Sequence, residues 1–268
     1  MQYNEIFNQL WNDYSDQNAS AGRVKALFEK QGDRVVNDHV AFRTFNDSRV
    51  NIQKIARLFL EAGYVERGQY NFEAKKLNAK HFELPGIPNA PRVFISELLL
   101  EEFSPWLQKT IANALDAADP KVFDDPKLIF HGRPWSKISY ETYNKLREES
   151  EYAAWLYVYG YRANHFTVSV NHLSNIGAIE DVNSLLKDNG FTLNTSGGEV
   201  KGTKDELLKQ SSIMADIIPV EFEEGVYNIP ACYYEFAERF KDENGELYSG
   251  FIAKSADKIF ESTNFYKK

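Results

Sequence analysis

The 268-residue chain contains little cysteine, no excess of basic residues and no long apolar run. Its one cysteine, Cys232, excludes an internal disulfide and a multi-cysteine metal cluster, which fits a reducing compartment. No stretch approaches the roughly 18 apolar residues of a membrane helix, so we expect no membrane partner. The N-terminus is acidic and mixed, whereas a signal peptide has a basic start and an apolar core. These absences together predict a cytoplasmic protein.

Acidic residues outnumber basic ones, yet the chain has enough apolar residues for a core. Lys and Arg number 31 against 39 Asp and Glu, which gives a formal net charge of −8. No basic run follows a face or a tail, so we expect no nucleic-acid partner. Hydrophobic residues make up 43% of the chain and aromatic residues 14%, so it can bury a sizeable core. We interpret residues 1–268 as a single domain.

Apolar periodicity divides the chain into four regions. Residues 1–36 have the spacing of short helices. Residues 37–100 have the order strand, helix and three strands, and the helix is expected to follow an N-cap at Asp47 or Ser48 and to stop at Gly63. Residues 101–162 have helical periodicity again, including the continuous stretch 139–161, and are interpreted as a helical insertion.

The region from 163 to 268 repeats the order of the first unit before a C-terminal tail. A strand over 164–171 is followed by a helix in 175–191, a glycine-rich hairpin at 195–203, and strands over 211–222 and 231–240. Each unit begins with an alternating strand led by a histidine, His39 or His165. Two βαβββ units side by side can curl into a half-open barrel with an inner face, so the predicted fold class is α+β.

Alternation along the strands brings three metal-ligating side chains to that inner face. His39 and His165 lead the paired first strands, and Glu235 lies on the last strand of the second unit, with Tyr234 and Phe236 on the opposite face. Two histidines and one carboxylate suit non-haem Fe(II) and leave three coordination positions open. The same ligand types also suit Zn²⁺, Mn²⁺ or Ni²⁺.

Other residues could take part in such a site. His81 and Glu83 share a strand face and could bind metal, but their strand has no matching histidine in the second unit. Glu97 lies on the fourth strand of the first unit and could be a fourth ligand or a base. His131 and His172 are interpreted as loop or rim residues.

Five motifs in order resemble a known family. The motifs "HVAFRTF", "NHFTVSVN", "LLKQSS", "YYEFAER" and "FIAKSADKIFEST" resemble those of the family formerly called domain of unknown function 1338, with a vicinal oxygen chelate-like fold. Its characterised members are 2-oxoadipate dioxygenase/decarboxylases of lysine breakdown. The resemblance runs from about residue 38 to 263. It implies Fe(II) bound by His39, His165 and Glu235, a substrate carboxylate bound by Arg43, and a pocket lined by Ser255.

Strand geometry independently supports the role of Arg43. Four residues of strand separate the backbones of His39 and Arg43 by about 13 Å, and the long guanidinium side chain can shorten that gap to the size of a short dicarboxylic acid. Its planar fork suits bidentate recognition of a carboxylate. The resemblance, together with this geometry, implies that Arg43 and Glu235 are catalytic residues and that the partners are a 2-oxo acid and O₂, with a 2-hydroxy acid and CO₂ as products. A different metalloenzyme (hydrolase, isomerase or lyase) and a non-catalytic small-molecule binder are the alternatives.

Overall fold

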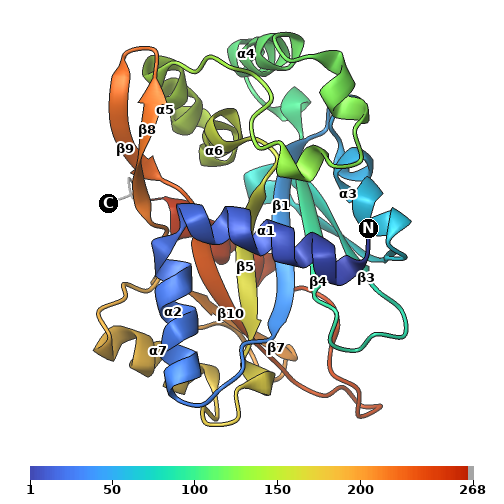
Figure 1. Ribbon diagram of the computed structural model, residues 1–268, viewed down its shortest axis with the longest axis vertical. Coiled ribbons are helices and arrows are strands. Elements are labelled where there is room, and N and C mark those ends of the chain that lie inside the picture. The colour runs from blue at the N-terminus through green and yellow to red at the C-terminus, as the bar shows by residue number, and fades with distance from the viewer. Residues whose placement is uncertain (265–268) are drawn as a thin grey trace.

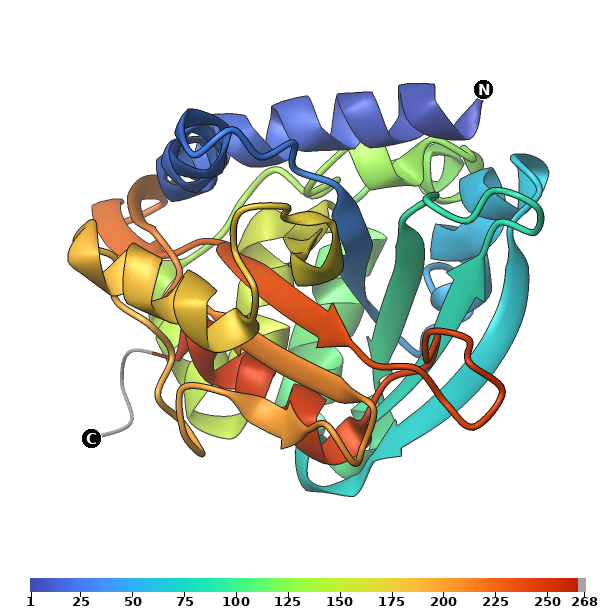
Figure 2. The same cartoon turned by 90° about the horizontal axis from the view of Figure 1, so that it is seen from below.

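The computed structural model describes residues 1–264 and shows a curved sheet with helices packed on its outer face (Figures 1 and 2). The last four positions of the predicted second unit lie outside the described residues. The α-helices are α1 (Tyr3–Gln17), α2 (Ala19–Lys30), α3 (Ile52–Glu61), α4 (Pro105–Asp116), α5 (Tyr140–Glu149), α6 (Glu151–Tyr159), α7 (Ile179–Asp188) and α8 (Ala253–Ile259). The strands are β1 (Asn37–Phe45), β2 (Val65–Phe72), β3 (Leu77–Glu83), β4 (Arg92–Leu98), β5 (Ala163–Ser169), β6 (Lys201–Thr203), β7 (Leu208–Ser212), β8 (Ile217–Phe222), β9 (Gly225–Pro230) and β10 (Tyr233–Arg239).

The sheet confirms the internal repeat. Its strand order is β2-β3-β4-β1-β5-β10-β7-β6, so each unit contributes four neighbouring strands. Within each unit the first strand pairs in parallel with the last, β1 with β4 and β5 with β10, and the units join through the antiparallel pair β1–β5. The curled eight-stranded sheet is the half-open barrel predicted from the sequence.

The alternation predicted for the leading strands is also confirmed. On the outer face, Phe42 of β1 packs on Phe59 of α3, with ring centroids 5.6 Å apart. Phe166 of β5 packs on Trp11 of α1, with ring centroids 5.3 Å apart. Figure 1 shows α1 crossing this face of the sheet. Because neighbouring residues of a strand point to opposite sides, His39 and His165 face the hollow of the sheet.

The predicted strand over 211–222 is wrong. The sheet strand β7 ends at Ser212, and β8 pairs with β9 in a separate two-stranded sheet. Between them the chain turns toward α2, where Asp216 accepts a hydrogen bond from the backbone N–H of Ser20 at 2.8 Å. The β8–β9 hairpin packs on the insertion, since Tyr227 stacks on Tyr140 of α5 with ring centroids 3.6 Å apart.

Capping residues set the helix boundaries, and they differ from the sequence-based prediction in two places. The helical stretch 139–161 is split because Ser150 caps α6, accepting a hydrogen bond from the backbone N–H of Ala153 at 3.1 Å. The cap of α3 is Asn51, whereas Asp47 instead binds Arg49 at 2.8 Å. Gly63 ends this helix as predicted, with φ of 97°, a conformation that favours glycine.

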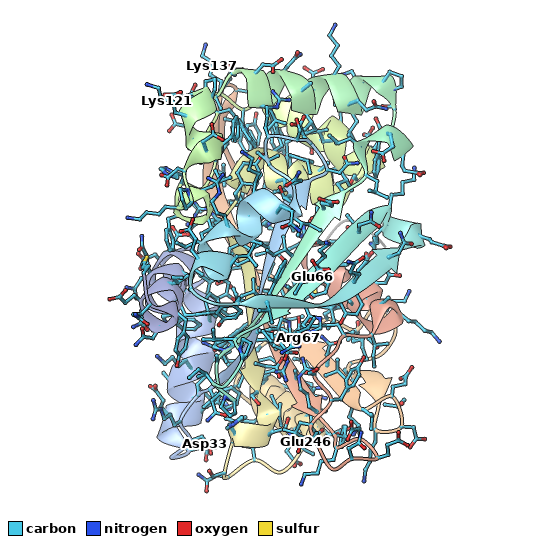
Figure 3. The ribbon with its side chains drawn as sticks, turned by 90° about the vertical axis from the view of Figure 1, so that its right-hand side faces the viewer. Asp33, Glu66, Arg67, Lys121, Lys137 and Glu246 are labelled. Carbon is cyan, nitrogen blue, oxygen red and sulfur yellow. The ribbon has the colours of Figure 1, made fainter. Side chains whose placement is uncertain are left out.

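The C-terminal tail forms α8 and a following turn, η6 (Phe260–Thr263). In Figure 2 this segment lies within the curve of the sheet, and α8 contacts β2, β6 and β7. The polar inner face is therefore covered by the end of the described chain. Charged side chains of both signs lie on the outside, as with exposed Glu66 and Arg67 on β2 (Figure 3). Among the described residues, no helix is long and apolar enough to cross a membrane.

Candidate metal centre

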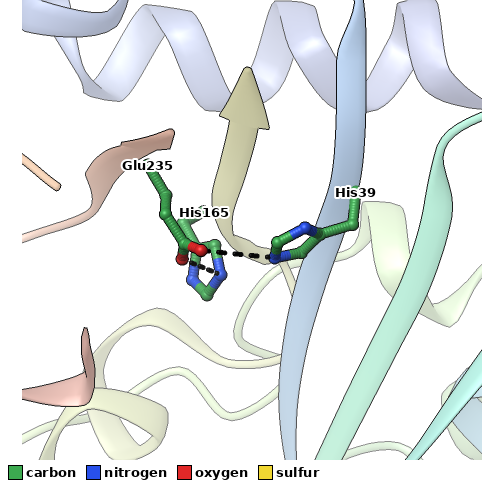
Figure 4. A group of neighbouring side chains, drawn as sticks. All are labelled: His39, His165 and Glu235. Atoms are coloured by element: carbon green, nitrogen blue, oxygen red, sulfur yellow. Dashed lines mark ion pairs between the residues drawn. The ribbon is translucent and has the colours of Figure 1, made fainter. Parts of the chain in front are cut away.

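Three side chains from different strands converge on the inner face (Figure 4). Strand pairing sets His39, Thr167 and Glu235 opposite one another across β1, β5 and β10. His165 lies one row further along β5. Its Nε2 is 3.1 Å from Glu235 Oε2, and His39 Nε2 is 3.7 Å from Glu235 Oε1. The potential ligand atoms of the three residues lie within 4.8 Å of one another, and each residue is at most 4% exposed.

Each histidine is oriented by the residue that precedes it. His39 Nδ1 donates to Asp38 Oδ1 at 2.8 Å, and His165 Nδ1 donates to Asn164 Oδ1 at 3.0 Å. A proton held at Nδ1 leaves the Nε2 lone pair free, and such outer partners commonly fix metal-binding histidines. Sequence reasoning missed both residues, although the signal was present: an Asp or Asn stands immediately before the histidine in each repeat.

A buried arginine holds Asp38 in turn. Arg239 donates from Nε to Asp38 Oδ2 at 2.7 Å and from a terminal nitrogen to Oδ1 at 2.9 Å. Burial alone would raise the pKa of Asp38, but Arg239 and the hydrogen bond from His39 hold it well below its ordinary value. Asp38 therefore stays charged, which supports the Nδ1 proton of His39.

Glu235 and His165 are also held in the protonation states that metal coordination requires. Gln210 donates to Glu235 Oε1 at 2.6 Å. Burial opposes the ionised form of Glu235, yet the neighbouring His165, His39 and Gln210 lower its pKa below the ordinary value. Burial lowers the pKa of His165 more than Glu235 raises it. Metal ligands must be neutral imidazoles and ionised carboxylates, so both shifts favour coordination.

The arrangement fits a divalent cation. The lone pairs of His39 Nε2 and His165 Nε2 face the carboxylate, and within residues 1–264 Glu235 Oε2 has no hydrogen-bond partner. Buried acceptors that face one another without a donor are costly unless a cation lies between them. The Thr167 hydroxyl, 3.0 Å from His39 Nε2, can supply one such donor. Two imidazoles and one carboxylate are ligands for Fe(II) or Zn²⁺.

The other candidate ligands lie elsewhere. His81 Nε2 contacts Glu83 at 3.0 Å and its Nδ1 contacts the Tyr70 hydroxyl at 2.8 Å, so both ring nitrogens have partners outside the cluster. Glu97 pairs with Thr44 on the outer face, where its side chain accepts a hydrogen bond from the N–H of Ile52 at 3.1 Å. It therefore binds the first backbone N–H of α3, outside the cluster.

Arg43 lies on the same inner face, two rows from His39, and is 1% exposed. A terminal nitrogen lies 3.4 Å from Glu151, a long contact. Its guanidinium also lies near aromatic rings, 4.9 Å from the ring centre of Tyr152 and 5.2 Å from that of Trp155. Its Nε has no hydrogen-bond partner among the described residues. The group retains capacity to bind an anion.

A small cavity adjoins the three ligands. It has a volume of about 20 Å³ and is closed by Phe251 and by residues of α8 and η6, including Ala256 and Phe260. Ser255 is buried on α8, but its hydroxyl points toward β6: a Cβ placed on Gly202 would lie 3.2 Å from Ser255 Oγ. In this closed arrangement Ala256, and not Ser255, lines the cavity.

A match to a protein-family model shows to which family the chain belongs. The model of the 2-oxoadipate dioxygenase/decarboxylase family matches residues 2–129 and 126–242. The chain belongs to this family. The resemblance drawn from the five motifs is therefore confirmed, and so is the expectation of an enzyme of the dioxygenase/decarboxylase class.

Individual relatives agree over nearly the whole chain. A rice (Oryza sativa subsp. japonica) 2-oxoadipate dioxygenase/decarboxylase is 38% identical over 98% of this chain and 79% of its own length. The rice hydroxyglutarate synthase, solved in complex with 2-oxoadipate, is 35% identical with a TM-score of 0.91, covering 97% of this chain and 91% of that one. A protein of Shewanella frigidimarina NCIMB 400, provisionally named a hydrolase, is 50% identical with a TM-score of 0.88, covering 94% and 98%.

The fold is shared beyond these relatives. A protein of Ralstonia eutropha JMP134, provisionally placed in the glyoxalase superfamily, is 19% identical with a TM-score of 0.75, over 90% of this chain and 83% of that one. The fold is thus vicinal oxygen chelate-like. The plant relatives carry chloroplastic or amyloplastic in their names, and the cytoplasmic location expected from the sequence stays a prediction.

Proposed function

We propose that this family member is an Fe(II)-dependent enzyme that converts 2-oxoadipate and O₂ into 2-hydroxyglutarate and CO₂. The observation that carries the proposal is the convergence of His39 Nε2, His165 Nε2 and the Glu235 carboxylate in a buried cluster, in which Glu235 Oε2 has no hydrogen-bond partner among the described residues. The rice relative solved with 2-oxoadipate supports the substrate. The reaction balances, because C₆H₈O₅ plus O₂ equals C₅H₈O₅ plus CO₂.

In this proposal His39, His165 and Glu235 hold the metal. When bound, Fe(II) supplies the redox chemistry with O₂ and has open positions for the 2-oxo acid. Asp38 and Asn164 keep the two imidazoles in the tautomer that presents Nε2. Gln210 fixes the carboxylate. The rigid strands therefore position the reaction centre before substrate arrives.

Arg43 binds the far carboxylate of the acid. It is buried on the same face as His39, and its only acidic contact among the described residues is Glu151, at a long 3.4 Å. A substrate carboxylate can therefore form shorter hydrogen bonds with the guanidinium than Glu151 does. Removing the distal charge from the substrate leaves this buried cation with only the long contact to Glu151, which favours dicarboxylic acids.

Substrate entry requires movement of the C-terminal segment. The cavity of about 20 Å³ has room for about one water molecule, and 2-oxoadipate is far larger. Phe251 and Phe260 form part of its cover. Displacing the 251–263 segment opens the inner face toward both the ligand cluster and Arg43, and its return excludes water during the reaction.

The test is oxygen consumption by protein loaded with Fe(II) under anaerobic conditions and then mixed with aerated 2-oxoadipate. We expect one CO₂ and one 2-hydroxyglutarate per O₂ consumed, with label from ¹⁸O₂ in the product hydroxyl and in one carboxylate. Zn²⁺-loaded protein is the control and should consume no O₂. Absence of uptake with iron across a panel of 2-oxo acids would refute the proposal, and metal-dependent turnover without O₂ would favour a hydrolase, isomerase or lyase.

A further inference from the structure

Tyr233 is a buried residue of the inner face that has no role in the function proposed above. It is 1% exposed, and within the described part of the chain its hydroxyl has no hydrogen-bond partner. Its ring stacks on that of His165, with centroids 4.6 Å apart and planes 26° apart. Because a buried hydroxyl normally finds a partner, the unsatisfied group suggests that a ligand supplies one.

Strand register places Tyr233 in the row between that of His39 and that of Arg43. Across β1, β5 and β10, one row contains His39 and Glu235, and the next contains Ala41, His165 and Tyr233. Arg43 follows one row beyond Ala41 on β1. The β1 position of this middle row is the small Ala41. A molecule that spans the metal and Arg43 passes through this row.

Tyr233 and Arg43 also meet the same covering segment. Arg43 contacts Thr263 at 3.4 Å and the Phe260 ring at 5.8 Å, and Tyr233 belongs to a small buried cluster with Ala215 and Ile259. Movement of this segment would therefore expose both groups together.

Two unsatisfied donors point to one kind of ligand. The Tyr233 hydroxyl and Arg43 Nε both lack an acceptor among residues 1–264. A carboxylate is acceptor-only and offers two oxygens, so it can satisfy both. We propose that Tyr233 donates a hydrogen bond to the distal carboxylate held by Arg43 and so contributes to selection of dicarboxylic over monocarboxylic 2-oxo acids. This inference rests on the proposed function and assigns a specificity residue to the same site.

The test compares Tyr233→Phe with Tyr234→Phe. The control is matched because Tyr234 is the next residue and is buried with an equally unpartnered hydroxyl, but it lies on the outer face against Trp11 and Tyr14. Phenylalanine keeps the ring that stacks on His165. Binding of 2-oxoadipate and of 2-oxohexanoate, which has the same length without the distal carboxylate, is measured by calorimetry on Zn²⁺-loaded protein, and KM and kcat are measured on Fe(II)-loaded protein.

We expect Tyr233→Phe to weaken 2-oxoadipate binding and raise its KM at least about tenfold, with 2-oxohexanoate binding, metal content and kcat unchanged. Tyr234→Phe should match the wild type for both acids. An equal loss for both acids, a loss of metal, or an unchanged preference for 2-oxoadipate would overturn the role of Tyr233. If the wild type itself does not prefer 2-oxoadipate, the proposed substrate is wrong. If the wild type prefers 2-oxoadipate and Tyr233→Phe keeps that preference, only the role of Tyr233 is refuted.

Discussion

Replacing Asp38 by asparagine should test two roles of its carboxylate, one in folding stability and one in metal binding. Asp38 accepts from His39 Nδ1 and pairs with Arg239 through two hydrogen bonds of 2.7 and 2.9 Å, and all three residues are buried. Removing one charge of a buried ion pair typically costs 3–5 kcal/mol. Because asparagine keeps one acceptor oxygen, we expect the free energy of unfolding of the metal-free protein to fall by about 3 kcal/mol.

Metal affinity should fall as well. Loss of an outer partner of a metal-binding histidine typically weakens binding 10–100-fold, or about 1.4–2.7 kcal/mol. Denaturant unfolding measures the first effect and competition with a chromophoric chelator measures the second. Asn164→Ala is the matched control at the equivalent position of the second repeat. It removes a neutral partner of His165, so its metal affinity should fall similarly, but its stability should fall by only about 1 kcal/mol.

The pH dependence gives a further check on Asp38. Its folded pKa lies below its unfolded value of about 3.9, so the stability that it contributes is complete above that pH and is lost only as the pH falls through the folded value. The difference between wild type and Asp38→Asn should therefore be constant from about pH 5 to pH 8. Unchanged unfolding and unchanged metal affinity in the variant would refute the reasoning.

Two further variants test other parts of the site, and a third tests the buried Lys201 of β6. Arg43→Ala should raise the KM for 2-oxoadipate roughly 10–100-fold through loss of charge-assisted hydrogen bonds while metal content stays constant; loss of metal would mean that its role is structural. Glu235→Gln should weaken Zn²⁺ binding more than the about 100-fold typical of an outer partner, and near-normal affinity in a chelator competition would exclude it as a ligand. Burial lowers the pKa of Lys201 to about 8, so the unfolded state binds more protons above that pH, and the free energy of unfolding should rise from pH 8 toward about 10. In denaturant titrations Lys201→Met should lack this rise. The same pH dependence in variant and wild type would contradict the shift.

The predictions from sequence were wrong where competing contacts or strand register decided the structure. The apolar residues from Ile213 to Ala215 suggest a continuing strand, but the contact of Asp216 with α2 lies outside the sheet, and β8 pairs with β9 instead. The sequence suggests Glu97 as a fourth ligand or a base, because Glu97 and Glu235 each lie on the last strand of a unit. The register shows that Phe94 is the counterpart of Glu235, since each lies one row beyond the partner of its unit's leading histidine.

The sequence by itself determined the duplicated units, the alternation of the leading strands and the identity of the three candidate ligands. These features follow from periodicity and side-chain type, which are local properties of the chain. Only the tertiary structure decided which partners those residues meet. The ion pair of Asp38 with Arg239, the bond from Gln210 to Glu235 and the closure of the cavity by α8 join residues far apart in sequence. Their contacts depend on strand register and sheet curvature, which composition and spacing do not specify.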